Sequence, residues 1–347
     1  MKVTIKDVAE RANVSKSTVS QYLNERFQYM SDDTKKKIAT AIEELNYQPN
    51  QLARGLKQKR TNVIGIVAST ILSRFTTEIV RAVEDACQKK GIQVLICNTD
   101  DNPEKEKYCV NSMISRQVDG LIVFPTRQNI YLYQNIISEN YPLVLIDRRI
   151  KEINASTVVL DNLLASKKAV DLLVENGHKK IGILSFPVQN NSISNRVDRI
   201  KGYRNALRDH GITVNKNFIK CGTLDKIPIM IQSLLNGKDR PTAIIASNDM
   251  ILEKLLIYVK ENNISVPNEL SIIGIDDVSF ASFYQPSITT IAQPAYDMGR
   301  ECSKLLFDQI EYNNGNLTSN NICNIKFEPI LLERESVLNL LTDIKEK

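Results

Sequence analysis

The sequence predicts a small α-helical helix-turn-helix head followed by an α/β core of two doubly wound parallel-sheet lobes. Two observations carry this prediction. Short amphipathic helical patterns fill the first 48 residues, and from residue 63 onward apolar strands alternate with helical segments. At 347 residues the chain is long enough for two or three domains. We therefore expect a head at 1–48, a hinge at 49–60 and a core at 61–347.

The head consists of three predicted helices, each with a start signal. Thr4 opens a capping box for a helix over 5–12. Ser15 can cap a second helix over 16–24, and Ser31 can cap a third. Three short helices with a tight turn between the first two are typical of a helix-turn-helix. A small structural bundle would show the same periodicity, so the fold pattern alone leaves both readings open.

The charge distribution favours a nucleic-acid partner. Residues 1–60 contain 12 Lys and Arg against 7 Asp and Glu, whereas the rest of the chain contains 33 of each sign. A basic module joined to a neutral one indicates binding to a polyanion.

The exposed face of the second helix suits the reading of base edges. Counting about 100° per residue brings Ser17, Ser20, Gln21 and Asn24 to one face. Hydroxyl and amide groups donate and accept in the major groove without the nonspecific attraction of a full charge. Lys16, in the first turn, can reach a phosphate or a guanine.

The hinge is a second predicted DNA contact. Leu52 and Leu56 lie one helical turn apart among basic residues, and an isolated helix of this length is unstable in water. We expect it to fold on DNA, with Leu56 as a wedge in the minor groove beside Lys57. The alternative is a flexible linker.

The core is predicted from buried strands. They lie at 63–67, 94–96, 120–123, 143–146, 181–184, 243–246 and 272–275. Strands of this kind alternating with helices form parallel sheets, and they are too many for one such sheet, which indicates two lobes. Ligands of doubly wound folds bind beyond the carboxyl ends of the strands.

Polar side chains that follow these strands are the candidate ligand-binding residues. The candidates are Arg74, Phe75, Arg127, Asp147, Arg148, Arg199, Asn248 and Asp276. Carboxylates and amides suit sugar hydroxyls. Each residue taken singly is more often a solvated loop residue or a helix cap, so their recurrence at strand ends is the stronger argument. The four arginines favour an anionic sugar derivative over a neutral one.

Several classes of protein are excluded by composition. No apolar stretch approaches a membrane span and no signal-peptide run opens the chain, so we expect a cytoplasmic protein. The six cysteines are widely spaced without a C-x-x-C pair, so we expect them to be reduced, with no zinc site or disulfide framework. Two histidines and no glycine-rich phosphate loop leave little for catalysis. We expect no cofactor, no metal and no enzymatic activity.

The head and hinge resemble the lactose-repressor family of bacterial regulators. The resemblance rests on Thr4-Ile5-Lys6-Asp7-Val8-Ala9, Thr18-Val19-Ser20 and Tyr47-Gln48-Pro49-Asn50. It implies that the start of the second helix contacts bases and that the hinge leucine intercalates at the operator centre. By position, the DNA-binding residues would be Lys16, Ser17, Gln21, Arg26, Leu56 and Lys57. Gly55 departs from a more helix-favouring residue often found there, which predicts a looser hinge.

The resemblance extends over the core. Its landmarks include Ser247-Asn248-Asp249 and Gly274-Ile275-Asp276-Asp277. It implies a core like the periplasmic sugar-binding proteins, with Asp147, Arg199, Asn248 and Asp276 at ligand-contacting positions. The runs at 14–24 and 118–126 resemble the 2-keto-3-deoxygluconate operon repressor subgroup, whose ligand is a sugar acid.

These observations together predict a DNA-binding transcription regulator that represses a sugar or sugar-acid operon. We expect it to bind a palindromic double-stranded operator as a homodimer and to respond to a small carbohydrate, for example 2-keto-3-deoxygluconate. The tail is too short for an independent coiled coil, so a tetramer is not expected. The alternative is a cytoplasmic sugar-acid-binding protein or enzyme whose head serves only assembly. The effector, its direction of action and the operator stay open.

Overall fold

The computed structural model divides the chain into two compact units, Met1–Asn62 and Val63–Lys347. It describes residues 3–47, 60–188, 193–237, 239–313, 315 and 321–341. Most of the predicted hinge, including Leu56 and Lys57, therefore lies outside the described residues.

The first unit contains the three predicted helices, α1 (Ile5–Arg11), α2 (Lys16–Leu23) and α3 (Asp32–Glu44). Their caps form as the sequence indicates. The Ser15 side chain accepts from the Thr18 amide at 3.1 Å, and the Ser31 side chain accepts from the Thr34 amide at 3.2 Å. Val8, Val19 and Ile38 are fully buried where the helices meet. The packing leaves the opposite face of α2 to solvent.

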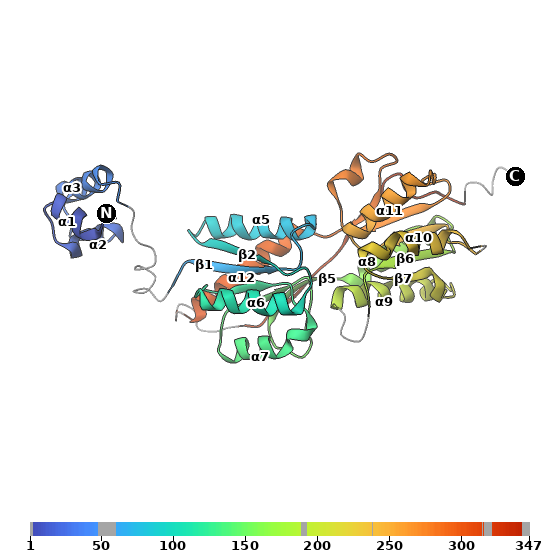
Figure 1. Ribbon diagram of the computed structural model, residues 1–347, viewed down its shortest axis with the longest axis horizontal. Coiled ribbons are helices and arrows are strands. Elements are labelled where there is room, and N and C mark those ends of the chain that lie inside the picture. Colours follow the sequence, from blue (N-terminus) through green and yellow to red (C-terminus); the bar gives the residue numbers. More distant parts are fainter. Residues whose placement is uncertain are drawn as a thin grey trace. The chain divides into compact units, whose positions relative to one another are not determined.

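The first lobe of the second unit is a parallel sheet in the order β11-β5-β4-β3-β1-β2. Helices lie on both sides of this sheet (Figure 1). Its strands are β1 (Val63–Ala68), β2 (Gln93–Asn98), β3 (Leu121–Val123), β4 (Leu143–Ile146), β5 (Ser156–Leu160) and β11 (Asn324–Phe327). Its helices are α5 (Arg74–Gln88), α6 (Pro103–Ser115), α7 (Ile130–Ser138) and α12 (Ala295–Asn313), with a 3-10 turn η1 (Arg127–Asn129). Apolar side chains of α5 and α12 pack on one face of the sheet and those of α6 and α7 on the other.

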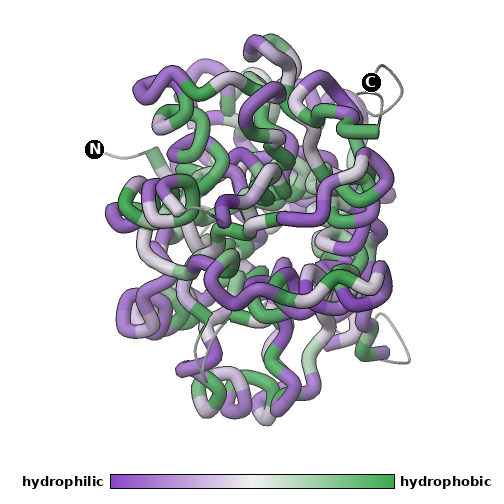
Figure 2. Tube along the Cα trace, turned by 90° about the vertical axis from the view of Figure 1, so that its right-hand side faces the viewer, coloured by the Kyte–Doolittle hydropathy of each residue, from purple (hydrophilic) through white to green (hydrophobic). Residues whose placement is uncertain are grey.

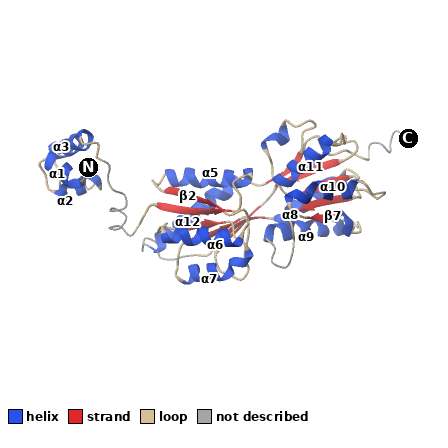
Figure 3. Cartoon of the chain, in the orientation of Figure 1, coloured by secondary structure: helices blue, strands red, loops and turns tan. Residues whose placement is uncertain are grey.

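The second lobe repeats this plan in the order β12-β10-β9-β8-β6-β7, with β12 antiparallel. Helices lie on both sides of its strands (Figure 3). Its strands are β6 (Ile181–Ser185), β7 (Ile219–Cys221), β8 (Ala243–Ala246), β9 (Ser271–Ile275), β10 (Thr289–Ala292) and β12 (Ile330–Leu332). Its helices are α8 (Asn162–Glu175), α9 (Ser194–Asp209), α10 (Ile227–Leu235) and α11 (Asp249–Glu261), with the 3-10 turns η2 (Lys216–Phe218), η3 (Leu224–Lys226) and η4 (Ser279–Ser282). Helices α8 and α9 cover one face, and α10 and α11 cover the other.

The lobes are not consecutive stretches of sequence. In the described part of the chain, the backbone passes between them three times, from β5 to α8, from β10 to α12 and from β11 to β12. The predicted two-lobed parallel architecture is confirmed. The apolar pattern missed five of the described strands. Strands β7, β11 and β12 are short and only partly buried, so their sequences lack a continuous apolar run, whereas β5 and β10 are buried but begin with Ser or Thr residues. Strand β2 forms as predicted, but its residues are half-buried or exposed.

One pair of cysteines differs from expectation. Cys97 on β2 and Cys109 on α6 form a disulfide, so the expectation of reduced cysteines is wrong for this pair. The turn from β2 into α6 brings their Cα atoms to 6.0 Å although 12 positions separate them, which spacing alone did not reveal.

Hydrophobic and hydrophilic residues alternate over short stretches of the trace (Figure 2). Within the described residues, no helix is long and apolar enough to cross a membrane. Nor do those residues include a group of His, Cys, Asp and Glu side chains that could hold a metal ion.

Candidate functional site

The first candidate surface is the solvent face of α2. Lys16, Ser17 and Gln21 are exposed there, and Arg26 is exposed in the turn that follows. Because the buried Val19 fixes which face of α2 packs inward, these four residues are presented outward. The surface can therefore offer hydroxyl, amide and cationic groups to a polar partner.

Two other residues predicted for this face are used inside the head. Ser20 and Asn24 are half-buried, and the Asn24 amide donates to the Ser20 carbonyl oxygen at 2.6 Å. Asn24 thus helps to close the end of α2, because carbonyl groups of the last helical turn lack backbone donors.

Sequence reasoning missed an aromatic residue beside this face. Tyr29, in the turn between α2 and α3, is 99% exposed. Phe27 of the same turn is held by edge contact with Tyr22, at 5.8 Å between ring centroids, and by Lys35, whose Nζ lies 5.1 Å from its ring. A turn residue has no helical periodicity, so its only signal was an aromatic side chain in a polar stretch.

The second candidate site is a cavity of about 410 Å³ between the two lobes. Residues that follow strands of both sheets line it, namely Ser69, Thr70, Asp100, Asp101, Asp147, Arg148, Phe186, Ser247, Asn248, Asp249 and Asp276. This is the crevice beyond the carboxyl ends of parallel strands where doubly wound folds bind ligands.

Six of the predicted ligand-binding residues meet in this cavity. They are Phe75, Asp147, Arg148, Arg199, Asn248 and Asp276. Arg74 and Arg127 do not line it. Arg74 Nε lies 2.7 Å from Glu78 Oε1 on α5, and Arg127 is paired with Glu152 at the surface. Glu78 holds Arg74 from one turn further along α5, and Glu152 in the loop after β4 holds Arg127, so the predicted cluster of four arginines does not form.

Sequence reasoning missed a different arginine, Arg196 on α9. It lines the cavity and is paired with Asp101 of the first lobe. Asp101 Oδ1 also lies 2.6 Å from Arg148 Nη1, and Arg148 Nε lies 3.2 Å from Asp147 Oδ2. Burial raises the pKa of Asp101, but the charges of Arg148 and Arg196 outweigh it and lower the pKa overall. Both guanidinium groups are therefore already neutralised by aspartates.

Arg199 is engaged within the second lobe. Its Nε donates to Asn162 Oδ1 at 2.7 Å, and its Nη1 donates to the Ser247 carbonyl oxygen. Its Nη2 lies 3.9 Å from Asp276 Oδ1. Burial raises the pKa of Asp276 to about 6; Arg199 opposes this rise, and the neighbouring charge of Asp249 adds to it.

The cavity holds three buried acceptor atoms that lack a donor. The Asn195 amide nitrogen donates to Asp147 Oδ2 at 2.7 Å, and the Gln293 amide nitrogen donates to Asp276 Oδ1. Because a carboxylate accepts only, these contacts fix both amide orientations. Asn195 Oδ1, Gln293 Oε1 and Asp147 Oδ1 are then left without a hydrogen-bond partner among the described residues. A molecule that fills this cavity must bring hydrogen-bond donors.

Apolar surfaces complete the lining. They come from Leu72, Phe75, Phe186, Leu224 and Met250. The Arg196 guanidinium lies 4.7 Å from the centroid of the Phe186 ring, which holds that ring in place. Apolar faces beside several acceptors match a polyhydroxylated ring, which has apolar C–H faces and a rim of donors.

Comparisons with known proteins agree with these two surfaces. The family described as bacterial regulatory proteins, lacI family, matches residues 4–50, and a periplasmic binding protein-like domain matches residues 170–337. The probable HTH-type transcriptional regulator EndR of Paenibacillus polymyxa is 53% identical and covers 98% of this chain and 100% of its own. The HTH-type transcriptional regulator KdgR of Bacillus subtilis is 33% identical over 90% of this chain and 92% of its own.

Solved structures share the whole architecture. The lac repressor dimer bound to operator matches with a TM-score of 0.84 and 25% identity over 97% of this chain and 100% of its own. The complex of the transcriptional regulator CelR with cellobiose matches with a TM-score of 0.70 and 26% identity over 96% of this chain and 100% of its own.

Proposed function

Because this chain belongs to the lacI family of bacterial regulatory proteins, we propose that it is a homodimeric cytoplasmic repressor whose operator affinity is controlled by a neutral saccharide. Like its relatives, the chain is a DNA-binding transcriptional regulator and not an enzyme. Membership in this family excludes the alternative of a sugar-acid-binding protein or enzyme whose head serves only assembly.

The proposed DNA contacts are Lys16, Ser17, Gln21 and Arg26 of the head, with Leu56 and Lys57 of the hinge. Exposure of the four head residues on and after α2 supports the proposal. One head covers one half-site, so a palindromic operator requires two copies of the chain.

The edge strand β2 supports a dimer formed through the core. Its Leu95 and Ile96 are 40% and 50% exposed, and a strand edge with exposed apolar residues favours pairing with another surface. Selection from random DNA should enrich a palindrome, and sedimentation should show a dimer. Enrichment of a single half-site, or a stable monomer or tetramer, would contradict the assembly.

The proposal of a neutral saccharide rests on the three buried acceptor atoms of the cavity that lack a hydrogen-bond donor. A sugar hydroxyl can donate to Asn195 Oδ1, Gln293 Oε1 and Asp147 Oδ1, whereas a sugar carboxylate would bring more acceptors. The lining also has five aspartates against three arginines, and each arginine is already held by protein groups. A buried anion without a free cation is unfavourable. The cavity therefore favours a neutral sugar, as in the CelR–cellobiose complex, over 2-keto-3-deoxygluconate.

Calorimetry on the full chain tests this proposal. Neutral mono- and disaccharides, cellobiose among them, should bind more tightly than sugar acids. Asn195→Ala removes one acceptor and should weaken binding by about fivefold, the value of one hydrogen bond. Arg127→Ala, outside the cavity, should leave affinity unchanged. Tighter binding of 2-keto-3-deoxygluconate than of every neutral sugar would contradict the proposal but not the family assignment.

A further inference from the structure

The Cys97–Cys109 disulfide lies where a covalent bond can act on the effector cavity. Cys97 is on β2, the outermost strand of the first-lobe sheet, and Cys109 is in the second turn of α6. Their Cα atoms are 6.0 Å apart, within the ~4.4–6.8 Å that disulfides span. The backbone therefore need not move for this bond to form or to open.

Cys97 is more accessible to solvent than the cysteines of the interior. Cys97 is half-buried on an edge strand, whereas Cys109 is buried beneath it. Cys87 and Cys302 are fully buried, and burial raises the pKa of the Cys87 thiol to about 12. A buried thiol without a neighbouring cysteine is chemically inert. The Cys97 side chain is directed toward α6, so it offers a reagent the more accessible sulfur of a pair, with Cys109 directly behind it.

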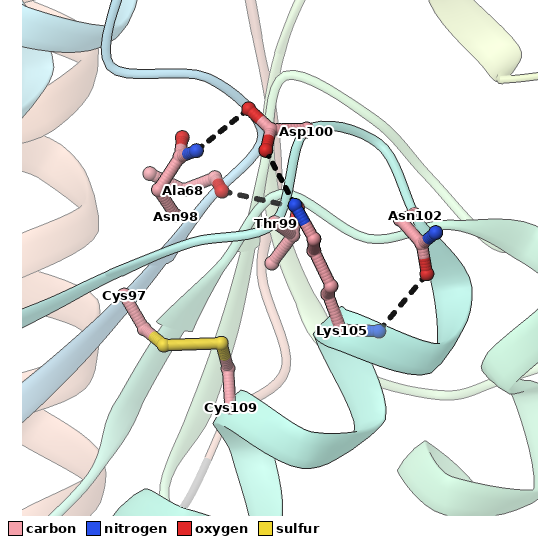
Figure 4. The surroundings of a disulfide bond; sticks show 8 residues. All are labelled: Ala68, Cys97, Asn98, Thr99, Asp100, Asn102, Lys105 and Cys109. Carbon is pink, nitrogen blue, oxygen red and sulfur yellow. Dashed lines mark hydrogen bonds and ion pairs between the residues drawn. A yellow bond between two sulfur atoms is a disulfide. The ribbon is translucent and has the colours of Figure 1, made fainter.

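The disulfide closes a loop of chain that lines the cavity. Figure 4 shows Asp100 above the disulfide, held by Asn98 at 2.7 Å and by Lys105 at 2.8 Å. Asp100 and Asp101 both have left-handed backbones, with φ of 53° and 56°. Two successive residues in this sparsely populated region are kept there by their surroundings.

Asp101 connects this loop to the second lobe. It is paired with Arg148 of its own lobe and with Arg196 of the other. A covalent tie between β2 and α6 reduces the freedom of the loop that carries Asp101, and its loss restores that freedom. The oxidation state of the pair can therefore change the order of the cavity wall.

We propose that Cys97 and Cys109 are a reversible thiol–disulfide modification site that tunes the effector cavity, with a hydroperoxide as oxidant and a dithiol as reductant. The Cys97 thiolate attacks the peroxide O–O bond and becomes a sulfenic acid, releasing an alcohol or water. The Cys109 sulfur then displaces the sulfenic oxygen as water. Two thiols and one hydroperoxide give one disulfide, one alcohol and one water, and the two electrons pass to the O–O bond.

The reverse reaction uses a dithiol. Its first thiolate attacks Cys97 and releases the Cys109 thiolate, and its second thiol then frees Cys97 and forms a disulfide in the reductant. The redox chemistry is independent of the proposed function, whereas the effect on effector binding rests on it.

The test is carried out on the full-length chain, treated with hydrogen peroxide and then with dithiothreitol. Mass spectrometry should identify a Cys97–Cys109 cross-link that forms and disappears reversibly. Hydrogen exchange of the amides at 98–108 should be about threefold or more faster in the reduced protein. The Cys97→Ser variant should form no cross-link and should exchange rapidly in both conditions. Cys323→Ser, at a half-buried cysteine just before β11, should behave as wild type.

Two results would overturn the proposal. One is the absence of the cross-link after peroxide treatment, and the other is identical hydrogen exchange at 98–108 in the oxidised and reduced protein. Calorimetry with cellobiose in both states separates this proposal from the proposed function. Binding in neither state would argue against the effector class and leave the thiol result standing, whereas equal binding in both would contradict the coupling to the cavity.

Discussion

The head and the core place their functional residues in opposite ways. Lys16, Ser17 and Gln21 of the head are exposed and lie within six positions on one helix. Asp147, Arg199 and Asp276 of the core are each no more than 7% exposed and come from distant segments. A contact residue of the head is therefore not needed for folding, whereas a cavity residue of the core also holds the protein together. This difference predicts that a substitution at a contact residue of the head lowers operator affinity without lowering stability. A substitution at a cavity residue of the core should lower stability as well.

The largest expected effect is a loss of stability when the Arg199 side chain is removed. Arg199→Ala leaves Asp276 without its countercharge and removes the donors to Asn162 and Ser247, so the free energy of unfolding should fall by about 3–5 kcal/mol. The measurement is urea unfolding followed by circular dichroism, because the chain contains no tryptophan. Arg127→Ala, at the exposed pair with Glu152, should cost less than about 1 kcal/mol. Similar losses in the two variants would remove the contrast between cavity and surface.

A smaller effect is expected in the head, on a different quantity. Gln21→Ala should weaken operator binding by about 1–3 kcal/mol through one base position, because an amide that reads a base edge discriminates between bases. Its free energy of unfolding should change by less than about 0.5 kcal/mol, because the side chain is exposed. Binding to operators substituted at each position checks this, with the exposed Thr40→Ala of α3 as control. An equal loss on every sequence would show that Gln21 does not read a base.

The smallest expected effect is a pH dependence of the core. The pKa of Asp276 is about 6 in the folded protein and 3.8 ordinarily, so between these pH values the folded state binds the extra proton. This group therefore makes the core more stable as pH falls from about 6 to about 4. Asp276→Asn should remove this contribution, so the difference in melting temperature between wild type and variant should change over that range. A difference that is constant with pH would show that Asp276 titrates normally.

In the head, the pH dependence of stability has the opposite sign. Hydrogen bonds from the Thr4 backbone and side chain lower the pKa of the exposed Asp7, so its contribution to stability is present above its ordinary pKa and is lost as pH falls below it. Acid should therefore weaken the cap of α1 only at pH values below the range in which protonation of Asp276 stabilises the core.

The two regions also differed in how much of their structure could be predicted. The caps at Ser15 and Ser31 and the buried strands β1, β3, β4, β6, β8 and β9 were predictable, because capping and periodicity depend on residues within one or two turns. The cavity was predictable as a place, since ligands of this fold bind beyond the strand ends. Its chemistry was not predicted. The i, i+4 spacing of Arg74 and Glu78 was readable from the sequence, but the pairing of Arg127 with Glu152 depends on the tertiary structure.

The sequence by itself determined the helix-turn-helix head, the basic charge of the N-terminal segment and the alternation of strands and helices in the core. Only the tertiary structure decided that Arg196 bridges the lobes through Asp101, that three acceptors in the cavity lack donors, and that Cys97 is bonded to Cys109. The physical reason is the distance along the chain over which each kind of interaction acts. Periodicity and capping act between neighbours in the chain, whereas ion pairs and hydrogen bonds in the cavity join side chains as many as 176 positions apart, whose choice of partner depends on how the sheets assemble.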